Sequence, residues 1–485
     1  MSAIDWLSQN PPDPQTGFVL LEPPISETGS GPLISVSPLE ALEHPIGLVP
    51  ASVTGLPVGL WQASDADTLA QLISDVPVID HPAMQTLLYT LLLAETLQPQ
   101  GDKSGDAFLM ARVDRLRQLG AVDPAQALVL QAGPEKSATH FMRWFDATLL
   151  TGDEDRSCAM LATAPHLHPD YAARIFCSVR QGDWSAGAVM LDGARALDLM
   201  PQAQLFLLDR FLNPDIFDGA PPLPTPVNPD PLTFRLFESI GEPLRTASLP
   251  RAFAVADLRD LAGWKAQIEG AERLARTGAL SPNRLLGIYT ARLPAASGGV
   301  WDRVEALQRF ETALDTRSAN AVAKTLPAVW EAMQQARLEV PFADLFGDRL
   351  AAQLLLDAKA QETSFFIRLL SSGYEAAADA APDTEMGRFL AALAHGTPQD
   401  AEPPNDMAAA IADGFADPAK PADNLQAMID TGRLGQAILM TMTQFARGAQ
   451  GNLSELSAAL STFRALGLED TARRASLQLL LLQRG

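Results

Sequence analysis

The sequence predicts an all-α fold: an α-solenoid of antiparallel helix pairs, preceded by an irregular Pro/Gly-rich N-terminal arm. Apolar residues make up 47% of the chain but aromatic residues only 6%, and the Ala and Leu that dominate are strong helix formers. From Ser64 onward, apolar residues recur at the spacing of a buried helix face. Residues 171–197 form a helix, a turn and a second helix, and such a pair buries its apolar face only by stacking on others.

The turn of this pair is Gly182-Asp183-Trp184. The small residues Gly187 and Ala194 would let the two helices approach closely, while Trp184 and Leu191 are expected to fill the seam between them. Over about one 34-residue repeat, this stretch resembles the tetratricopeptide class. Gly/Trp helix starts recur at residues 263–264 and 299–301, which suggests a degenerate repeat.

Four segments are expected from the distribution of proline and glycine. Residues 1–62 are dense in both and form the arm, which cannot be continuous helix. Residues 63–217 form a first helical block, residues 218–231 a Pro-rich linker, and residues 232–485 a second helical block.

Several helix ends are predicted from capping chemistry. Ser64-Asp65 and Asp170 have the side chains of N-caps, and Gly120 is placed as a left-handed C-cap. Gly467 to Asp470 is expected to be a tight turn between the last two helices.

The net charge of −22 excludes most nucleic-acid partners, because phosphate binding needs a basic surface. It also disfavours an anionic membrane surface. No apolar run is long enough to cross a bilayer, so no direct membrane insertion is expected. No motif indicates a cofactor.

The two cysteines provide evidence about the cellular compartment of the protein. Cys158 and Cys177 fall in consecutive predicted helices, and an antiparallel pair could bring them within bonding range in an oxidising compartment. The alternative is two buried free thiols in a cytoplasmic protein. The first residues lack a signal peptide, yet the Pro, Gly and Ser density of residues 10–60 is typical of a mature secreted chain. We therefore expect a periplasmic protein whose signal peptide is absent from this sequence.

The most motif-like loop runs from Arg292 to Arg303. Gly298 and Gly299 would let backbone amides approach an anion at a helix N-terminus. Arg292 and Arg303 would add charge-assisted hydrogen bonds, and Trp301 a stacking face. These five residues are the candidate interaction loop.

The alternative for this loop is a plain connection between helices. Trp301 would then be a core residue, and Asp302 would serve the positive end of the following helix.

No catalytic or metal signature stands out. The chain lacks a Gly-x-Ser-x-Gly elbow, a phosphate-binding Gly-x-x-x-x-Gly-Lys and a His-Glu-x-x-His motif. His166 and His168, with the two cysteines, are the only metal-like cluster, but their spacing matches no standard zinc module. The alternative is a loop in which Asp170 caps the next helix.

The body is also similar to a family of uncharacterised proteins of high-GC alphaproteobacteria, sometimes labelled antifreeze proteins. The resemblance is carried by Ile4-Asp5-Trp6-Leu7-Ser8, Ser52-Val-Thr-Gly-Leu-Pro57, Ala173-Arg174-Ile175-Phe176-Cys177 and Pro294 to Arg303. In that family the first of these stretches usually follows a secretion signal, and no catalytic residues are established. The regular threonine ladder of an ice-binding helix is missing here. A looser likeness in composition is to periplasmic helical-repeat partners of the flagellar stator.

The sequence therefore predicts a non-enzymatic periplasmic scaffold or adaptor that binds a protein partner in an envelope assembly, with a flagellar-motor-associated component as one possibility. The alternative is an envelope carbohydrate-binding protein or hydrolase with a small site on a helical body. A third possibility is self-association through the terminal helices.

Overall fold

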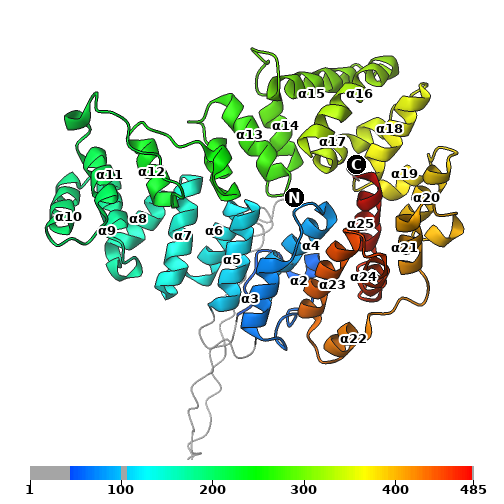
Figure 1. The fold of residues 1–485 in the computed structure, drawn as a ribbon, viewed down its shortest axis with the longest axis horizontal. Coiled ribbons are helices and arrows are strands. Elements are labelled where there is room, and N and C mark those ends of the chain that lie inside the picture. Colours follow the sequence, from blue (N-terminus) through cyan, green and yellow to red (C-terminus); the bar gives the residue numbers. More distant parts are fainter. Residues whose placement is uncertain (1–43, 100–105, 483–485) are drawn as a thin grey trace, which may run out of the picture. The chain divides into compact units, whose positions relative to one another are not determined.

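The computed structural model describes residues 44–99 and 106–482. Predictions for residues 1–43 of the arm lie outside the described residues. Within the described ranges the regular secondary structure is helical, and β-pairing is limited to isolated bridges between Ile46 and Thr96 and between Val49 and Ala94. The all-α prediction is confirmed (Figure 1).

The helices follow one another with short connections. The first group is α2 (Ala51–Thr54), α3 (Ala66–Asp75), α4 (Pro82–Leu93), α5 (Ala107–Leu119), α6 (Val122–Ala132), η1 (Pro134–Lys136), α7 (Ala138–Thr151), α8 (Glu154–Thr163), η2 (Pro165–Leu167), α9 (Tyr171–Arg180), α10 (Trp184–Ala196), α11 (Gln202–Leu212) and η3 (Pro214–Phe217). The middle group is α12 (Pro231–Ser239), η4 (Thr246–Ser248), η5 (Arg251–Leu258), α13 (Trp264–Ala275), α14 (Pro282–Thr290), α15 (Val300–Asp315), α16 (Ala319–Ala336), α17 (Glu339–Ala351) and α18 (Ala358–Leu369). The last group is α19 (Tyr374–Ala378), α20 (Glu385–Ala394), η6 (Pro398–Asp400), α21 (Asp406–Gly414), α22 (Asp423–Asp430), α23 (Leu434–Ala449), α24 (Leu453–Ala465) and α25 (Glu469–Leu481).

The predicted helix ends are confirmed by their capping contacts. Asp65 accepts a hydrogen bond from the Thr68 amide and begins α3, and Asp170 begins α9 in the same way. Gly120 ends α5 with a φ of 91°. Gly467 and Leu468 lie in the turn that joins α24 to α25, whereas Glu469 and Asp470, which the prediction placed in the turn, are the first two residues of α25. These local signals act through a few neighbouring residues and so survive in the fold.

The predicted pair α9 and α10 packs closely, with one correction. A Cβ at Gly187 would lie 3.1 Å from Val179, so the glycine permits the close approach, and Leu191 is buried in the seam. Trp184, by contrast, is 48% exposed. Its placement in the seam was wrong, because it is the first residue of α10 and its ring lies at the edge, stacked on Phe211 at 6.2 Å.

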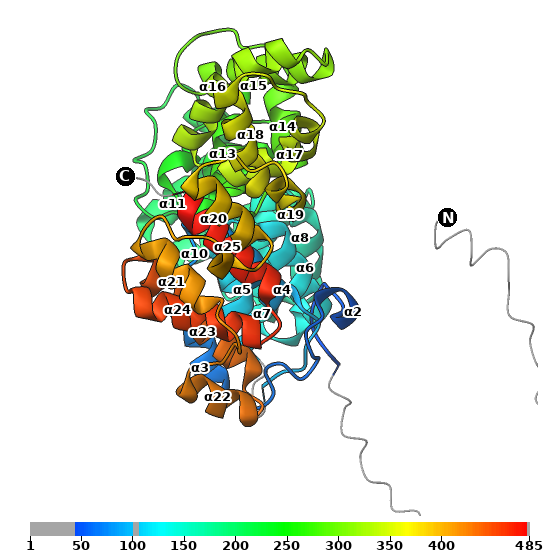
Figure 2. The same ribbon diagram turned by 90° about the vertical axis from the view of Figure 1, so that its right-hand side faces the viewer.

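Helices from the two ends of the described chain pack against each other. Figures 1 and 2 show α25 beside α4, and α3 also contacts α23. The Ala83 amide donates to Gln478 Oε1 at 2.7 Å, and the Trp61 ring covers Gly435, where a Cβ would lie 2.4 Å from it. In a linear solenoid each repeat touches only its neighbours. The helix pairs are thus present, but the tetratricopeptide-like solenoid is not confirmed.

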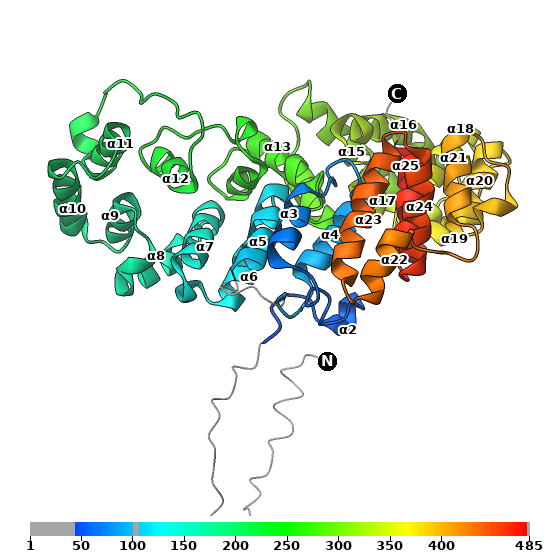
Figure 3. The ribbon, with the colours of Figure 1, turned by 60° about the horizontal axis from the view of Figure 1, so that its bottom comes forward.

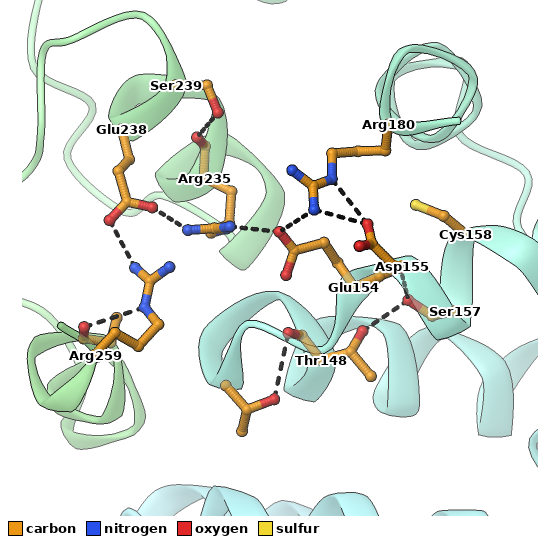
Figure 4. A network of polar contacts seen from close by, with 12 residues as sticks. Thr148, Glu154, Asp155, Ser157, Cys158, Arg180, Arg235, Glu238, Ser239 and Arg259 are labelled. Atoms are coloured by element: carbon orange, nitrogen blue, oxygen red, sulfur yellow. Dashed lines mark hydrogen bonds and ion pairs between the residues drawn. The ribbon is translucent and has the colours of Figure 1, made fainter. Parts of the chain in front are cut away.

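An ion-pair network bridges the segment between η3 and α12, which carries no regular helix (Figure 4). Arg235 of α12 contacts both Glu154 of α8 and Glu238. Glu238 also accepts from Arg259 Nη2 at 2.6 Å, and Arg180 of α9 lies 3.6 Å from Glu154. Because Glu154 is buried, its charge must be matched by these cations. The division into two blocks at residues 218–231 stays a prediction.

The last part of the predicted arm is anchored by a buried arginine. Arg112 of α5 donates to the carbonyls of Leu92 at 2.8 Å, Ala94 at 3.1 Å and Ile46 at 3.0 Å. Burial lowers the pKa of Arg112 to about 10, so the guanidinium remains charged at neutral pH. The Arg112 guanidinium thus binds carbonyl groups at the end of α4 and holds the extended chain before α2 against the helices.

Replacing Arg112 by Met should destabilise the protein by about 3 kcal/mol, because three backbone carbonyls lose charge-assisted hydrogen bonds in the interior. Urea unfolding followed by circular dichroism measures the change. The same substitution at the exposed Arg309 of α15 is the control and should cost less than about 0.5 kcal/mol. Equal losses for the two variants would contradict the anchoring role of Arg112.

Candidate functional site

The candidate interaction loop is exposed where it carries its glycines. Arg292, Gly298 and Gly299 are all exposed, and both glycines have positive φ, at 95° and 61°. The Gly298 amide donates to Asp302 Oδ1 at 2.8 Å. One of the amides expected to meet an anion is therefore already bound within the loop.

The other two residues of the candidate loop belong to the helix packing. Trp301 is half-buried, and its ring packs against Trp264 at 5.1 Å. Arg303 donates from Nε and Nη2 to the two carboxylate oxygens of Glu272, at 3.0 and 2.9 Å. The guanidinium of Arg303 is thus held by a buried carboxylate, as the alternative of a structural connection between helices requires.

Glu272 is the centre of a buried polar cluster. Besides Arg303, it accepts a hydrogen bond from the Tyr289 hydroxyl at 2.7 Å and from Arg276 Nη2 at 3.1 Å. Burial and the adjacent carboxylate raise the pKa of Tyr289 well above its usual value, so the phenol stays protonated and donates. Burial lowers the pKa of Arg303, but its contact with Glu272 outweighs this effect and raises the pKa. The cluster joins α13, α14 and α15.

The tip of the loop is the part that is accessible to a partner. Leu293 is 83% exposed. Beneath the tip, a groove of about 950 Å³ lies between the loop and helices α15 and α16, and its lining includes Leu293, Ser297, Arg309 and Thr312. Partner binding by this loop stays a prediction, and of the five candidate residues Arg292 has the most freely presented charge.

Replacing Arg303 by Ala should destabilise the protein by about 3 kcal/mol, because the buried Glu272 would lose its bidentate partner. Replacing Arg292 by Ala, on the same loop, should change the stability by less than about 0.5 kcal/mol. Urea unfolding of the two variants gives the comparison. A harmless Arg303 substitution would mean that its guanidinium is available for a ligand after all.

The cysteines and histidines of the α8–α9 hairpin have structural contacts. Cys158 and Cys177 form a disulfide, with their sulfur atoms 2.01 Å apart. His168 is buried against Phe145 at 5.2 Å, and its Nδ1 accepts from the Asp170 amide at 3.2 Å. Burial lowers the pKa of His168, which keeps the ring neutral. His166 is exposed. Among the described residues, no group of three or more His, Cys, Asp or Glu could hold a metal ion.

Reduction of the disulfide should lower the free energy of unfolding by about 3 kcal/mol, because the bond closes a loop between residues 19 apart in sequence. Urea unfolding with and without dithiothreitol measures this. A variant with both cysteines replaced by Ala should not respond to the reductant. Equal stability of the oxidised and reduced wild type would contradict the prediction.

A surface that the sequence analysis missed lies on α10, α11 and the turns beside them. Large apolar side chains are exposed there, and we call these six residues the α10–α11 edge: Trp184, Val189, Leu197, Leu199, Phe206 and Ile216. Figures 1 and 3 show α10 and α11 at one end of the helical array.

The α10–α11 edge has a signal in the sequence that could have been found. Helix α10 buries only Gly187, Leu191 and Ala194, which form one narrow face. Val189 lies outside that face and is 72% exposed. Apolar residues of α10 that lie outside this face can be counted from the sequence. Their number would have indicated that α10 has more apolar surface than one adjacent helix can bury.

None of the described helices has the length and apolar character needed to span a membrane. No family model matches the chain, and no curated protein or solved structure matches it either.

Proposed function

We propose that this protein is a non-enzymatic periplasmic scaffold that binds a protein partner through the α10–α11 edge. The observation that carries the proposal is that six large apolar side chains are exposed within one stretch of the chain, on α10, on α11 and in the segments that follow each of them. Contiguous apolar surface on a protein is commonly a site of protein association, because its burial removes it from water.

The residue types at this edge suit a protein interface. Aromatic side chains are enriched in interface cores, and Trp184 and Phe206 are both about half exposed. The Trp184 ring rests on a packed neighbour: it stacks on Phe211, which in turn stacks on the buried Phe176 at 5.8 Å. Aromatic anchors of this kind lose little conformational entropy when a partner covers them.

The rest of the helical body supplies the rigidity that such an edge needs. The disulfide fastens α8 to α9, directly beneath α10, and the ion pairs of Glu154 tie α8 and α9 to α12. Packed helix pairs are also found in helical-repeat scaffolds that bind proteins. The disulfide also supports the periplasm as the compartment, because such a bond persists in an oxidising environment.

Replacing both Val189 and Phe206 by Lys should abolish partner capture without changing the stability by more than about 0.5 kcal/mol per site, because both side chains are exposed. The exported protein would be used as bait in the envelope fraction, and the recovered proteins identified by mass spectrometry.

The matched control replaces Leu354 and Leu356 by Lys, since these leucines are 87% and 93% exposed in the connection between α17 and α18. The control should capture the same partner as the wild type. Loss of capture in both variants, or in neither, would contradict binding through the α10–α11 edge. Recovery of further copies of the chain alone would instead support self-association.

A further inference from the structure

A cavity lies where the beginning, middle and end of the described chain meet. Its volume is about 1350 Å³, and it is bounded by α4, the turn after α13, α17, α23 and α25. A cavity of this size accommodates a small organic molecule. The residues that line it divide into a polar side and an apolar side.

Arg251, the first residue of η5, provides an uncommitted charge on the polar side. It is half-buried, and it makes no hydrogen bond or ion pair with any residue that the structure describes. Burial is the main reason why its pKa is lowered, and the nearby charges of Arg273 and Arg276 lower it further. A half-buried guanidinium keeps part of its hydration, and its donors are free to bind an acceptor that enters the cavity.

The two neighbouring arginines are already bound to other groups. Arg273 donates to the carbonyls of Thr246 at 2.7 Å and Leu249 at 2.8 Å. Arg276 donates to the Ala336 carbonyl at 2.6 Å and to Glu272. They therefore add positive potential around Arg251 without competing for the same ligand.

The hydroxyl of Tyr89 is the second uncommitted polar group of this cavity. It is buried and has no well-formed hydrogen bond within the described ranges, although the side chain of Thr277 lies beside it and lowers its pKa. Tyr89 and Arg251 line the same cavity; burial raises the pKa of Tyr89, and the charge of Arg251 lowers it. A protonated phenol and a guanidinium both donate, and together they lack an acceptor.

Three carboxylates line the cavity: Glu339 and Asp344 belong to α17, and Asp80, whose charge attracts Arg251, is already paired. Its Oδ1 lies 3.1 Å from Arg337 Nη1, and Asp80 is exposed at the rim. An oxyanion that enters the cavity would supply the acceptor that neither Arg251 nor Tyr89 has. A carboxylate and a phosphate both have this chemistry.

The apolar side favours a ligand with a hydrocarbon part. It is formed by side chains of α17, α23 and α25 together with the turn before α4, among them Ile79, Val340, Phe445, Leu479 and Leu482. Transfer of hydrocarbon from water onto such a surface is favourable by about 0.8 kcal/mol for each buried methylene group.

We propose that this cavity binds a small organic anion, with its oxyanion group held by Arg251 and Tyr89 and its hydrocarbon part against α23 and α25. The proposal is independent of the protein-binding edge on α10 and α11. Its ligand class is an amphiphilic carboxylate or phosphate, in an otherwise strongly acidic protein.

The test is isothermal titration of the full chain with octanoate, acetate and inorganic phosphate at constant ionic strength. Octanoate should bind saturably and at least about tenfold more tightly than acetate, because only octanoate reaches the apolar side. Replacing Arg251 by Gln should weaken octanoate binding at least about tenfold, and replacing Tyr89 by Phe should weaken it several-fold. Tighter binding of phosphate than of octanoate would overturn the assignment of the apolar side.

The matched control is Arg292→Gln, which removes one positive charge on the exposed loop and should leave octanoate binding unchanged. In the absence of anion, the Arg251→Gln variant should unfold at the same temperature as the wild type or higher, because a half-buried cation near two others is removed. No saturable octanoate binding, or equal binding by the wild type and the Arg251→Gln variant, would overturn the proposal. An equal loss in the Arg292→Gln control would show a general charge effect and overturn it as well.

Discussion

Buried charges between short helices are the constraint on which this structure depends. Arg112, Glu154 and Glu272 are each nearly or fully removed from solvent, and each is matched by several groups from other elements. A buried ion left without partners costs several kcal/mol, so helices that carry these residues are held in one relative placement. Apolar packing of Ala and Leu supplies most of the driving force, but it is far less directional.

The same constraint separates the groups that hold the fold together from those that are free to act. Arg303 looks like a ligand-binding cation until Glu272 is seen to take both sides of its guanidinium. Arg251 lies in the opposite situation, half-buried with no acceptor in the described chain. What distinguishes the two arginines is whether the guanidinium already has an acceptor. Only the contacts of the folded chain show this.

The two proposed surfaces occupy different parts of the body. The α10–α11 edge lies at one end of the helical array, whereas the cavity lies where α4 meets α25 (Figures 1 and 3). The network of Glu154, Arg235 and Glu238 joins α8 to α12 (Figure 4).

Features governed by a few neighbouring residues were determined by the sequence alone: the helical fold class, the caps at Asp65 and Asp170, and the hairpin that carries Cys158 and Cys177. The placement of Trp184 at an exposed edge, the packing of α4 on α25, and the acceptor of Arg303 were decided only by the tertiary structure. The physical reason is the separation in sequence between the groups that interact. Capping and hairpin closure depend on adjacent backbone geometry, whereas a charge finds its partner, and a ring its neighbour, only after distant helices have packed.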